Sequence, residues 1–196
     1  EGADEFFGGY NIYHEPLSLK GYQKLPKGLR KGLAAIAKKL PDIKGRDFII
    51  RGSKDVEERF IGNANMFSVE EREKYLKHPI THIPPKDIVA STYKKVEGLN
   101  DIAKMQYIDT NFWLQGDILL KADKMSMAHC LESRVPFLDV KVFDYAKKLP
   151  IDFRCNEEAT KRAFRIAAKR HLPEATANKK KLGFPVPIRV WLKEDK

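Results

Sequence analysis

Residues 100–131 read NDIAKMQYIDTNFWLQGDILLKADKMSMAHCL and decide the fold. Apolar side chains fall on nearly every face of the helix that this stretch predicts, which is typical of a helix buried on most sides. Gly116 could divide the helix. Methionine fills irregular gaps in protein interiors, so we interpret Met125 and Met127 as core residues. The sequence therefore predicts a helical protein built around this segment.

Shorter helices are expected on both sides of residues 100–131. The signals are helical periodicity, capping residues and prolines at the ends. The expected helices cover residues 27–40 ahead of Pro41, 45–61 with a break at Gly52, 68–77 behind a Ser68–Glu71 capping box, 139–149 ahead of Pro150, 160–171 behind Thr160, and a last turn with Trp191 and Leu192. A short strand could lie at 47–50. We predict an all-α chain in which residues 1–196 form a single helical segment.

Composition excludes several classes of protein. Hydrophobic residues make up 42% of the 196 residues, which excludes wholesale disorder. There is neither a membrane-length apolar run nor a signal-peptide pattern. Cys130 and Cys155 form neither a disulfide framework nor a zinc site, which fits a reducing cytoplasm. His78 and His82 have metal-ligand spacing on a helix, but Pro79 favours an ordinary loop there. The net charge of +10 suits an anionic partner, but it does not distinguish phosphate, nucleic acid and an acidic membrane surface.

The chain opens with EGADEFFGGY, residues 1–10, without an initiator methionine. We expect a fragment of a longer protein that begins inside a functional loop. On a helix, Glu1, Asp4 and Glu5 would share one face and repel one another. A metal ion, a helix N-terminus or a cationic partner would offset that repulsion. An acidic first turn followed by an ordinary bend at Gly8-Gly9 explains the pattern equally well, and both interpretations stay open.

A second group of charges lies in and after the long apolar stretch. Its members are Asp123, Glu132, Arg134 and Asp139. An unpaired charge in an apolar environment is costly, so we favour an ion-pair network among them over a contact with substrate.

Basic residues gather near the end of the chain. Lys161 and Arg165 would share a helix face with Phe164, where they could clamp a phosphate or lie on the surface. Their residue types alone favour the surface. Lys179-Lys180-Lys181 is typical of a solvated basic run. Phe184-Pro185-Val186-Pro187 resembles a rigid docking segment.

Four segments in this order resemble the glutamine-dependent asparagine synthases. They are EGADEFFGGY (1–10), LLKADKMSMAHCLESRVPFLD (119–139), TKRAFRIAAKRHLP (160–173) and KKKLGFPVPIRVWL (179–192). The second segment is strongly specific, and residues 11–99 add little. The resemblance implies a ligase with an N-terminal glutaminase domain and an α/β synthetase domain of the PP-loop, adenine-nucleotide α-hydrolase type, whose C-terminal part is helical.

The resemblance also implies a reaction. Glutamine supplies ammonia, and ATP with Mg²⁺ activates the side-chain carboxylate of aspartate as a β-aspartyl-adenylate. Ammonia then gives asparagine, AMP and pyrophosphate. The implied setting is cytoplasmic, away from membranes and nucleic acid, with homo-oligomers an open possibility.

The resemblance also implies roles for individual residues, wherever this sequence matches a motif of the family. Glu1 and Lys161 match the catalytic glutamate and lysine, which overturns the surface interpretation of Lys161. Gly2, Asp4 and Arg165 match positions at ATP and pyrophosphate, with Asp4 also at magnesium. Asp123, Glu132, Arg134 and Asp139 match a signature that we interpret as architectural.

The departures from the family pattern are as informative as the matches. The sequence contains no Ser-Gly-Gly-x-Asp-Ser phosphate loop and no N-terminal cysteine. We therefore expect the glutaminase domain and the phosphate-loop core to be absent, and the isolated chain to be inactive. Three alternatives remain. The first is the same chemistry on another carboxylic acid, as in β-lactam synthetases or other amidotransferase branches. The second is a basic helical module that binds nucleic acid, and the third is a segment that serves only to fold and pack against the rest of a longer protein.

Overall fold

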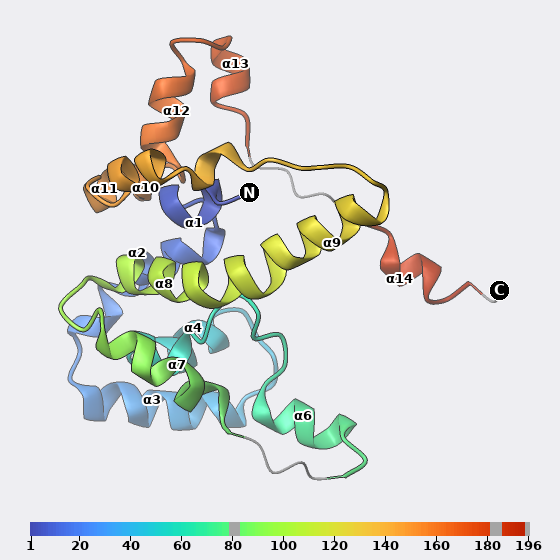
Figure 1. Ribbon diagram of the computed structural model, residues 1–196. Helices are drawn as coiled ribbons and strands as arrows, with labels where there is room; N and C mark the ends of the chain where they lie inside the picture. The colour runs from blue at the N-terminus through green and yellow to red at the C-terminus, as the bar shows by residue number, and fades with distance from the viewer. Residues whose placement is uncertain (79–82, 181–185, 195–196) are drawn as a thin grey trace. The chain divides into compact units, whose positions relative to one another are not determined.

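The computed structural model describes residues 1–78, 83–180 and 186–194. These residues form helices joined by short loops (Figure 1). Their β structure is limited to one antiparallel bridge between Cys155 and Thr160. The predicted all-α class is confirmed, whereas the strand considered at 47–50 is wrong, because those residues lie within a helix.

The chain divides into two compact units, residues 1–163 and residues 164–196. The first unit contains α1 (Ala3–Phe7), η1 (Asn11–His14), α2 (Glu15–Leu19), η2 (Tyr22–Lys24), α3 (Lys27–Lys39), α4 (Arg46–Gly52), α5 (Val56–Arg59), α6 (Val69–Tyr75), α7 (Pro85–Lys94), α8 (Asp101–Asp109), the π-helical segment η3 (Thr110–Leu119), α9 (Leu120–Ala128), η4 (Pro136–Leu138), α10 (Val140–Ala146) and α11 (Ile151–Arg154). Helix α12 (Arg162–Ala168) begins in the first unit and continues in the second, which also holds α13 (Glu174–Ala177) and α14 (Ile188–Trp191).

Most helix boundaries follow the local signals in the sequence. The capping box of Ser68 and Glu71 opens α6 with both reciprocal hydrogen bonds in place. The expected 45–61 helix is interrupted after Gly52, as predicted, so that α4 and α5 are separate. The helix expected at 160–171 is shorter than predicted, because Thr160 pairs with Cys155 and α12 starts only at Arg162.

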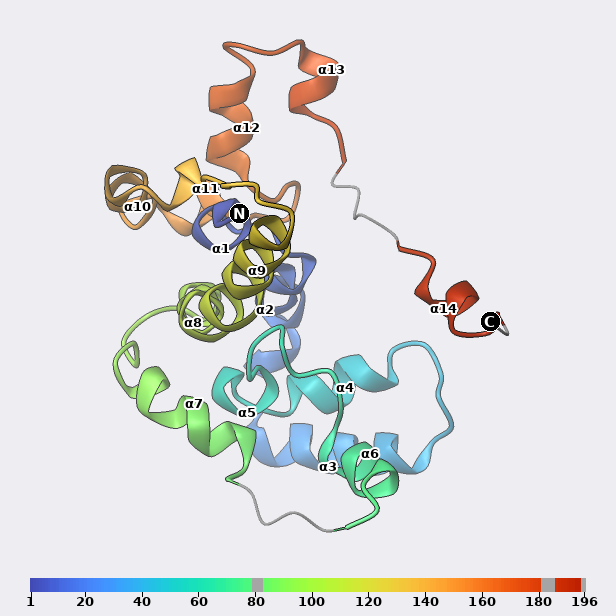
Figure 2. The same cartoon turned by 45° about the vertical axis from the view of Figure 1, so that its right-hand side comes forward.

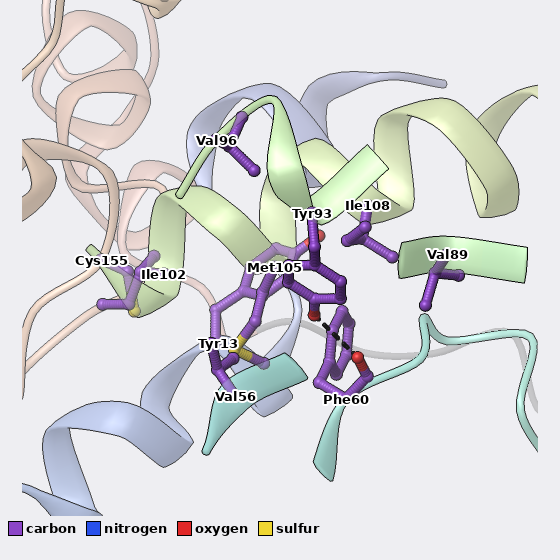
Figure 3. Close-up of a cluster of buried hydrophobic side chains, with 10 residues drawn as sticks. All are labelled: Tyr13, Val56, Phe60, Val89, Tyr93, Val96, Ile102, Met105, Ile108 and Cys155. Carbon is purple, nitrogen blue, oxygen red and sulfur yellow. Dashed lines mark hydrogen bonds between the residues drawn. The ribbon is translucent and has the colours of Figure 1, made fainter. Parts of the chain in front are cut away.

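The core of the first unit lies around α8, which packs against α1, α5, α7 and η1. Figure 3 shows the buried cluster of Tyr13, Val56, Phe60, Val89, Tyr93, Val96, Ile102, Met105, Ile108 and Cys155. Buried hydroxyl groups in this region form hydrogen bonds with other groups of the chain. The Tyr93 hydroxyl donates to the Phe60 carbonyl at 2.7 Å, and the Tyr13 hydroxyl donates to Asp109 at the same distance.

The long helix continues without a break through Gly116, from α8 through the π-helical segment into α9. Its burial falls along its length. Met105 and Ile108 are fully buried and Leu114 is nearly so, but no residue of α9 is buried. Figure 1 shows α9 extending away from α8 beyond the π-helical segment, and Figure 2 views α9 more nearly along its axis.

The prediction that the whole stretch is buried is therefore wrong for α9. Met125 and Met127 are 60% and 55% exposed, so they are not core residues of this chain. Periodicity reports only where apolar side chains lie on a helix, and it does not report what covers them. Among the described residues, no helix is long and apolar enough to span a membrane.

Candidate functional site

The opening residues form a short helix held between two glycines in the left-handed conformation. Gly2 precedes α1 with φ of +85°, and Gly8 follows it with φ of +71°. Both conformations are costly for residues with a Cβ atom. The Asp4 carbonyl accepts hydrogen bonds from the N–H groups of Gly8 and Gly9, which folds the chain back sharply after one turn. The side chain of Asp4 is thereby presented beside Gly9.

A tight turn far along the chain positions Lys161. Cys155 and Thr160 form the antiparallel bridge at its base. Within the turn, the Asn156 side-chain oxygen accepts from the N–H groups of Glu158 at 3.1 Å and Ala159 at 2.9 Å. Lys161 follows directly, with φ of +53°, a left-handed conformation that costs an L-residue about 1–2 kcal/mol. Strained backbone of this kind persists only where the surrounding structure holds it, and it is concentrated at functional sites.

The two segments meet at an ion pair between Asp4 and Lys161. The Lys161 ammonium lies 3.1 Å from Asp4 Oδ2, and the side chains are only 20% and 25% exposed. Gly9 makes this approach possible. A Cβ atom at position 9 would lie 2.0 Å from Asp4 Oδ1 and 2.1 Å from Lys161 Cε. The absence of a side chain at Gly9 is therefore a requirement of the pair, not of an ordinary bend.

The acidic residues of the opening segment do not share one helix face, because α1 begins only at Ala3. Glu1 precedes α1 and is exposed, Asp4 is partly exposed, and Glu5 is 1% exposed. Glu5 accepts a hydrogen bond from the Tyr10 hydroxyl at 2.7 Å, and Trp113 Nε1 donates to that hydroxyl at 3.1 Å. Burial raises the pKa of Glu5 above its ordinary value. The fold thus assigns Glu5 to the interior and leaves Asp4 to face Lys161.

Sequence reasoning missed the side chains that brace α1 from behind. Gln106, on α8, is 4% exposed and donates to the Glu5 carbonyl at 2.7 Å. Arg154 in turn donates to the Gln106 side-chain oxygen at 3.2 Å. The sequence offered no signal for this role, because α8 also carries Asp101, Lys104 and Asp109, and only the hydrogen bonds of the buried Gln106 amide distinguish it from them.

The predicted ion-pair network of the signature segment does not form as expected. Glu132 and Arg134 pair at 2.5 Å, but both are exposed. Asp139 instead accepts from the Lys141 N–H at 2.7 Å and caps the N-terminus of α10, while Asp123 is exposed on α9. The segment does contact the candidate site through Leu138, because a Cβ atom at Gly2 would lie 2.2 Å from Leu138 Cδ2. Close packing therefore accounts for glycine at position 2.

Lys161 and Arg165 do not share a helix face, because Lys161 lies outside α12. Within the second unit, Arg165 donates to the carbonyls of Ala177 at 3.0 Å and Lys179 at 2.9 Å. These bonds tie α12 to the end of α13. His82 and residues 181–185, which include part of the basic run and of the proline-rich segment, lie outside the described residues.

Comparison with known proteins shows the family to which the sequence belongs. The family model described as "Asparagine synthase" matches residues 1–196. The chain belongs to the asparagine synthase family. It is 47% identical, over its whole length, to "Asparagine synthetase [glutamine-hydrolyzing] 1" of Bacillus subtilis, of which it covers 31%. It is 46% identical, over 98% of its length, to a "Putative asparagine synthetase [glutamine-hydrolyzing]" of Mycobacterium bovis, of which it covers 30%.

The chain thus spans about a third of the length of these asparagine synthetases. No solved structure matches it significantly. The resemblance seen in the four sequence segments is confirmed, and the match extends through residues 11–99, where recognisable motifs were sparse.

Proposed function

We propose that this chain forms one wall of the synthetase site of an ATP-dependent, amide-forming asparagine synthase. The complete reaction converts aspartate, ATP and ammonia from glutamine to asparagine, AMP and pyrophosphate. The observation that carries the proposal is the contact between Asp4 and Lys161, two motif residues from distant parts of the sequence. Family membership and 47% identity to an asparagine synthetase support the same reaction.

Lys161 would stabilise negative charge on the phosphates of ATP and of the adenylate. In the proposed first step, the aspartate side-chain carboxylate attacks the α-phosphorus and pyrophosphate leaves. A fixed cation beside charge that develops in this step lowers the barrier, because it needs no reorganisation when the charge appears. The turn at residues 155–160 offers this fixation, since the Cys155–Thr160 bridge and the Asn156 hydrogen bonds hold the backbone that leads into Lys161.

Asp4 would hold magnesium together with pyrophosphate. Among the described residues there is no cluster of three or more His, Cys, Asp or Glu side chains that could cage a metal ion. A single partly exposed carboxylate suits Mg²⁺ bound to phosphate, because such ions take one or two carboxylates and keep several waters. When bound, the ion would neutralise phosphate charge.

Glu1 and Gly2 complete the proposed wall. Glu1 is exposed ahead of α1, where it is accessible to a substrate, and we assign it the catalytic glutamate role. Ammonia then attacks the acyl carbon of the β-aspartyl-adenylate, AMP leaves, and a base takes the proton from nitrogen. The motif match alone assigns Arg165 to ATP and pyrophosphate binding, and within the second unit its guanidinium group donates to the Ala177 and Lys179 carbonyls.

A chimera tests the proposal. Residues 1–196 would replace the matching segment of the Bacillus subtilis asparagine synthetase, to which they align along their whole length. In that chimera, Lys161→Met should abolish aspartate-dependent exchange between ATP and pyrophosphate while glutaminase activity continues. Lys27→Met is the matched control, because Lys27 forms an exposed ion pair with Asp55. Near-normal exchange in the Lys161 variant would remove this lysine from the proposed reaction.

The isolated chain and the acid substrate need separate experiments. We expect the isolated chain to have no synthetase activity and to bind ATP weakly or not at all, and micromolar affinity by isothermal titration would contradict this. Exchange assays of the chimera with a panel of carboxylic acids would identify the substrate. Preference for an acid other than aspartate would assign the chain to a different branch of the family.

A further inference from the structure

A cavity lies in the first unit, between α1, α8, α10 and α11. Its volume is about 360 Å³, and residues of all four helices line it. Cavities that hold small organic molecules begin at about 300 Å³, so this one is large enough for a ligand of modest size.

Most of the cavity wall is apolar. Phe6 and Phe143 both line it, and their rings pack with centroids 5.1 Å apart at an interplanar angle of 56°. Ala103, Leu149 and Ile151 extend the apolar wall. A ligand with an aromatic or branched aliphatic part would therefore exchange water for apolar contacts here.

One side of the wall carries a cation whose partners are all neutral. Arg154 donates to the carbonyls of Leu149 at 3.1 Å and Lys147 at 2.7 Å, and to the Gln106 side-chain oxygen at 3.2 Å. Among the described residues, no carboxylate lies within ion-pair distance of its guanidinium group. Glu5 lines the same cavity but accepts its hydrogen bond from Tyr10.

Arg154 therefore has unmet capacity for an anion. Burial lowers its pKa below the ordinary value, as expected for a partly desolvated cation without a counter-charge. The planar guanidinium group has five N–H donors, and three are used in these bonds. A carboxylate is the group that such a fork binds best.

We propose that this cavity binds a small carboxylic acid with an aromatic or branched aliphatic tail, with its carboxylate on Arg154 and its tail against Phe6 and Phe143. The site does not include the Asp4–Lys161 pair and does not depend on the function proposed above. Its occupant would adjoin Gln106, which contacts both Arg154 and the Glu5 carbonyl. Binding would therefore affect the position of α1, the helix that carries Asp4.

Isothermal titration of the 196-residue chain with two matched probes tests this proposal. The probes are 4-phenylbutyrate and its neutral analogue 4-phenylbutyramide. For a ligand of this size, an affinity on the order of 1 mM is expected. The carboxylate should bind at least about tenfold more tightly than the amide, the factor expected for a hydrogen bond to a charged group. Equal binding of the two probes, or no binding of either at about 10-fold higher concentration, would overturn the proposal.

Two variants locate the site. Ala103→Phe fills the cavity from α8 and should weaken 4-phenylbutyrate binding about tenfold or more, the loss expected when several apolar contacts disappear. Ala35→Phe places the same side chain on an exposed position of α3 and should leave binding unchanged. Arg154→Met should remove the preference for carboxylate over amide. Unchanged affinity in the Ala103 variant would refute the location even if the Arg154 variant fails to fold.

Discussion

Replacing Gly9 by alanine should open the Asp4–Lys161 pair without unfolding the chain. The φ angle of Gly9 lies outside the left-handed region, so the backbone accepts an L-residue there. The new Cβ atom would lie 2.0 Å from Asp4 Oδ1 and 2.1 Å from Lys161 Cε. Because these atoms lie toward the ends of side chains that can rotate, the side chains should separate while the main chain stays in place.

The expected change in stability is small because two effects oppose each other. A glycine-to-alanine change at a compatible backbone position stabilises by about 0.4–1 kcal/mol, through the entropy of the unfolded chain. Loss of a partly exposed ion pair costs about 1 kcal/mol or less. The free energy of unfolding of Gly9→Ala should therefore lie within about 1 kcal/mol of the wild-type value, although the pair is broken.

A double-mutant cycle distinguishes an opened pair from an intact one. Asp4→Asn and Lys161→Met, alone and together, would be measured by urea unfolding in the wild-type and Gly9→Ala backgrounds. The coupling energy should be about 0.5–1 kcal/mol in the wild type and near zero beside alanine. If the coupling energy is equally large in both backgrounds, Gly9 does not control the approach of the two side chains, and the steric reasoning is wrong.

Three further predictions concern the rest of the first unit. Burial raises the pKa of Asp109 from 3.8 to about 6 in the folded chain, so its contribution to stability is fully present below about pH 4 and is lost as the pH rises through 6. The wild type should therefore lose about 3 kcal/mol of unfolding free energy relative to Asp109→Asn between about pH 3 and pH 7, and a constant difference in urea unfolding would contradict this. Gly2→Ala should lower the free energy of unfolding by about 1–3 kcal/mol, because Gly2 has φ of +85° and its Cβ position meets Leu138. Gly28 lies in α3 with nothing within 4 Å of its Cβ position, so Gly28→Ala should raise the free energy of unfolding by about 0.5–1 kcal/mol. A thiol reagent such as Ellman's should label exposed Cys130 rapidly and buried Cys155, whose pKa is raised to about 11, only on unfolding, and fast labelling that persists in Cys130→Ala would contradict the burial of Cys155.

Local signals in the sequence were sufficient for most helices. The capping box at Ser68 and the break at Gly52 are both decided by neighbouring residues, and both are confirmed. The exposure of α9 could not be predicted, because an apolar helix has the same periodicity whether or not other parts of a protein cover it. Pairing partners were equally unpredictable, since the separation of Asp123 from Arg134 depends on the path of the chain between them.

The candidate site was predictable in part. Motif resemblance selected Asp4 and Lys161, and the structure brings them together. Three contributions depend on the three-dimensional structure. They are the close approach at Gly9, the support of α1 by Gln106 and Arg154, and the left-handed backbone of Lys161. Each depends on distances between segments that are remote in sequence, which periodicity and composition do not encode.

The backbone at Lys161 sets the stability of the chain against the chemistry proposed for the Lys161 side chain. Glycine would adopt φ of +53° more easily than lysine does, so a selection for thermal tolerance alone should enrich Lys161→Gly. That replacement would relax the main chain and remove the ammonium group in one change. Directed evolution for thermal stability would thus tend to remove the Asp4–Lys161 ion pair. A library in which residue 161 is kept as lysine would have to gain thermal stability at other positions.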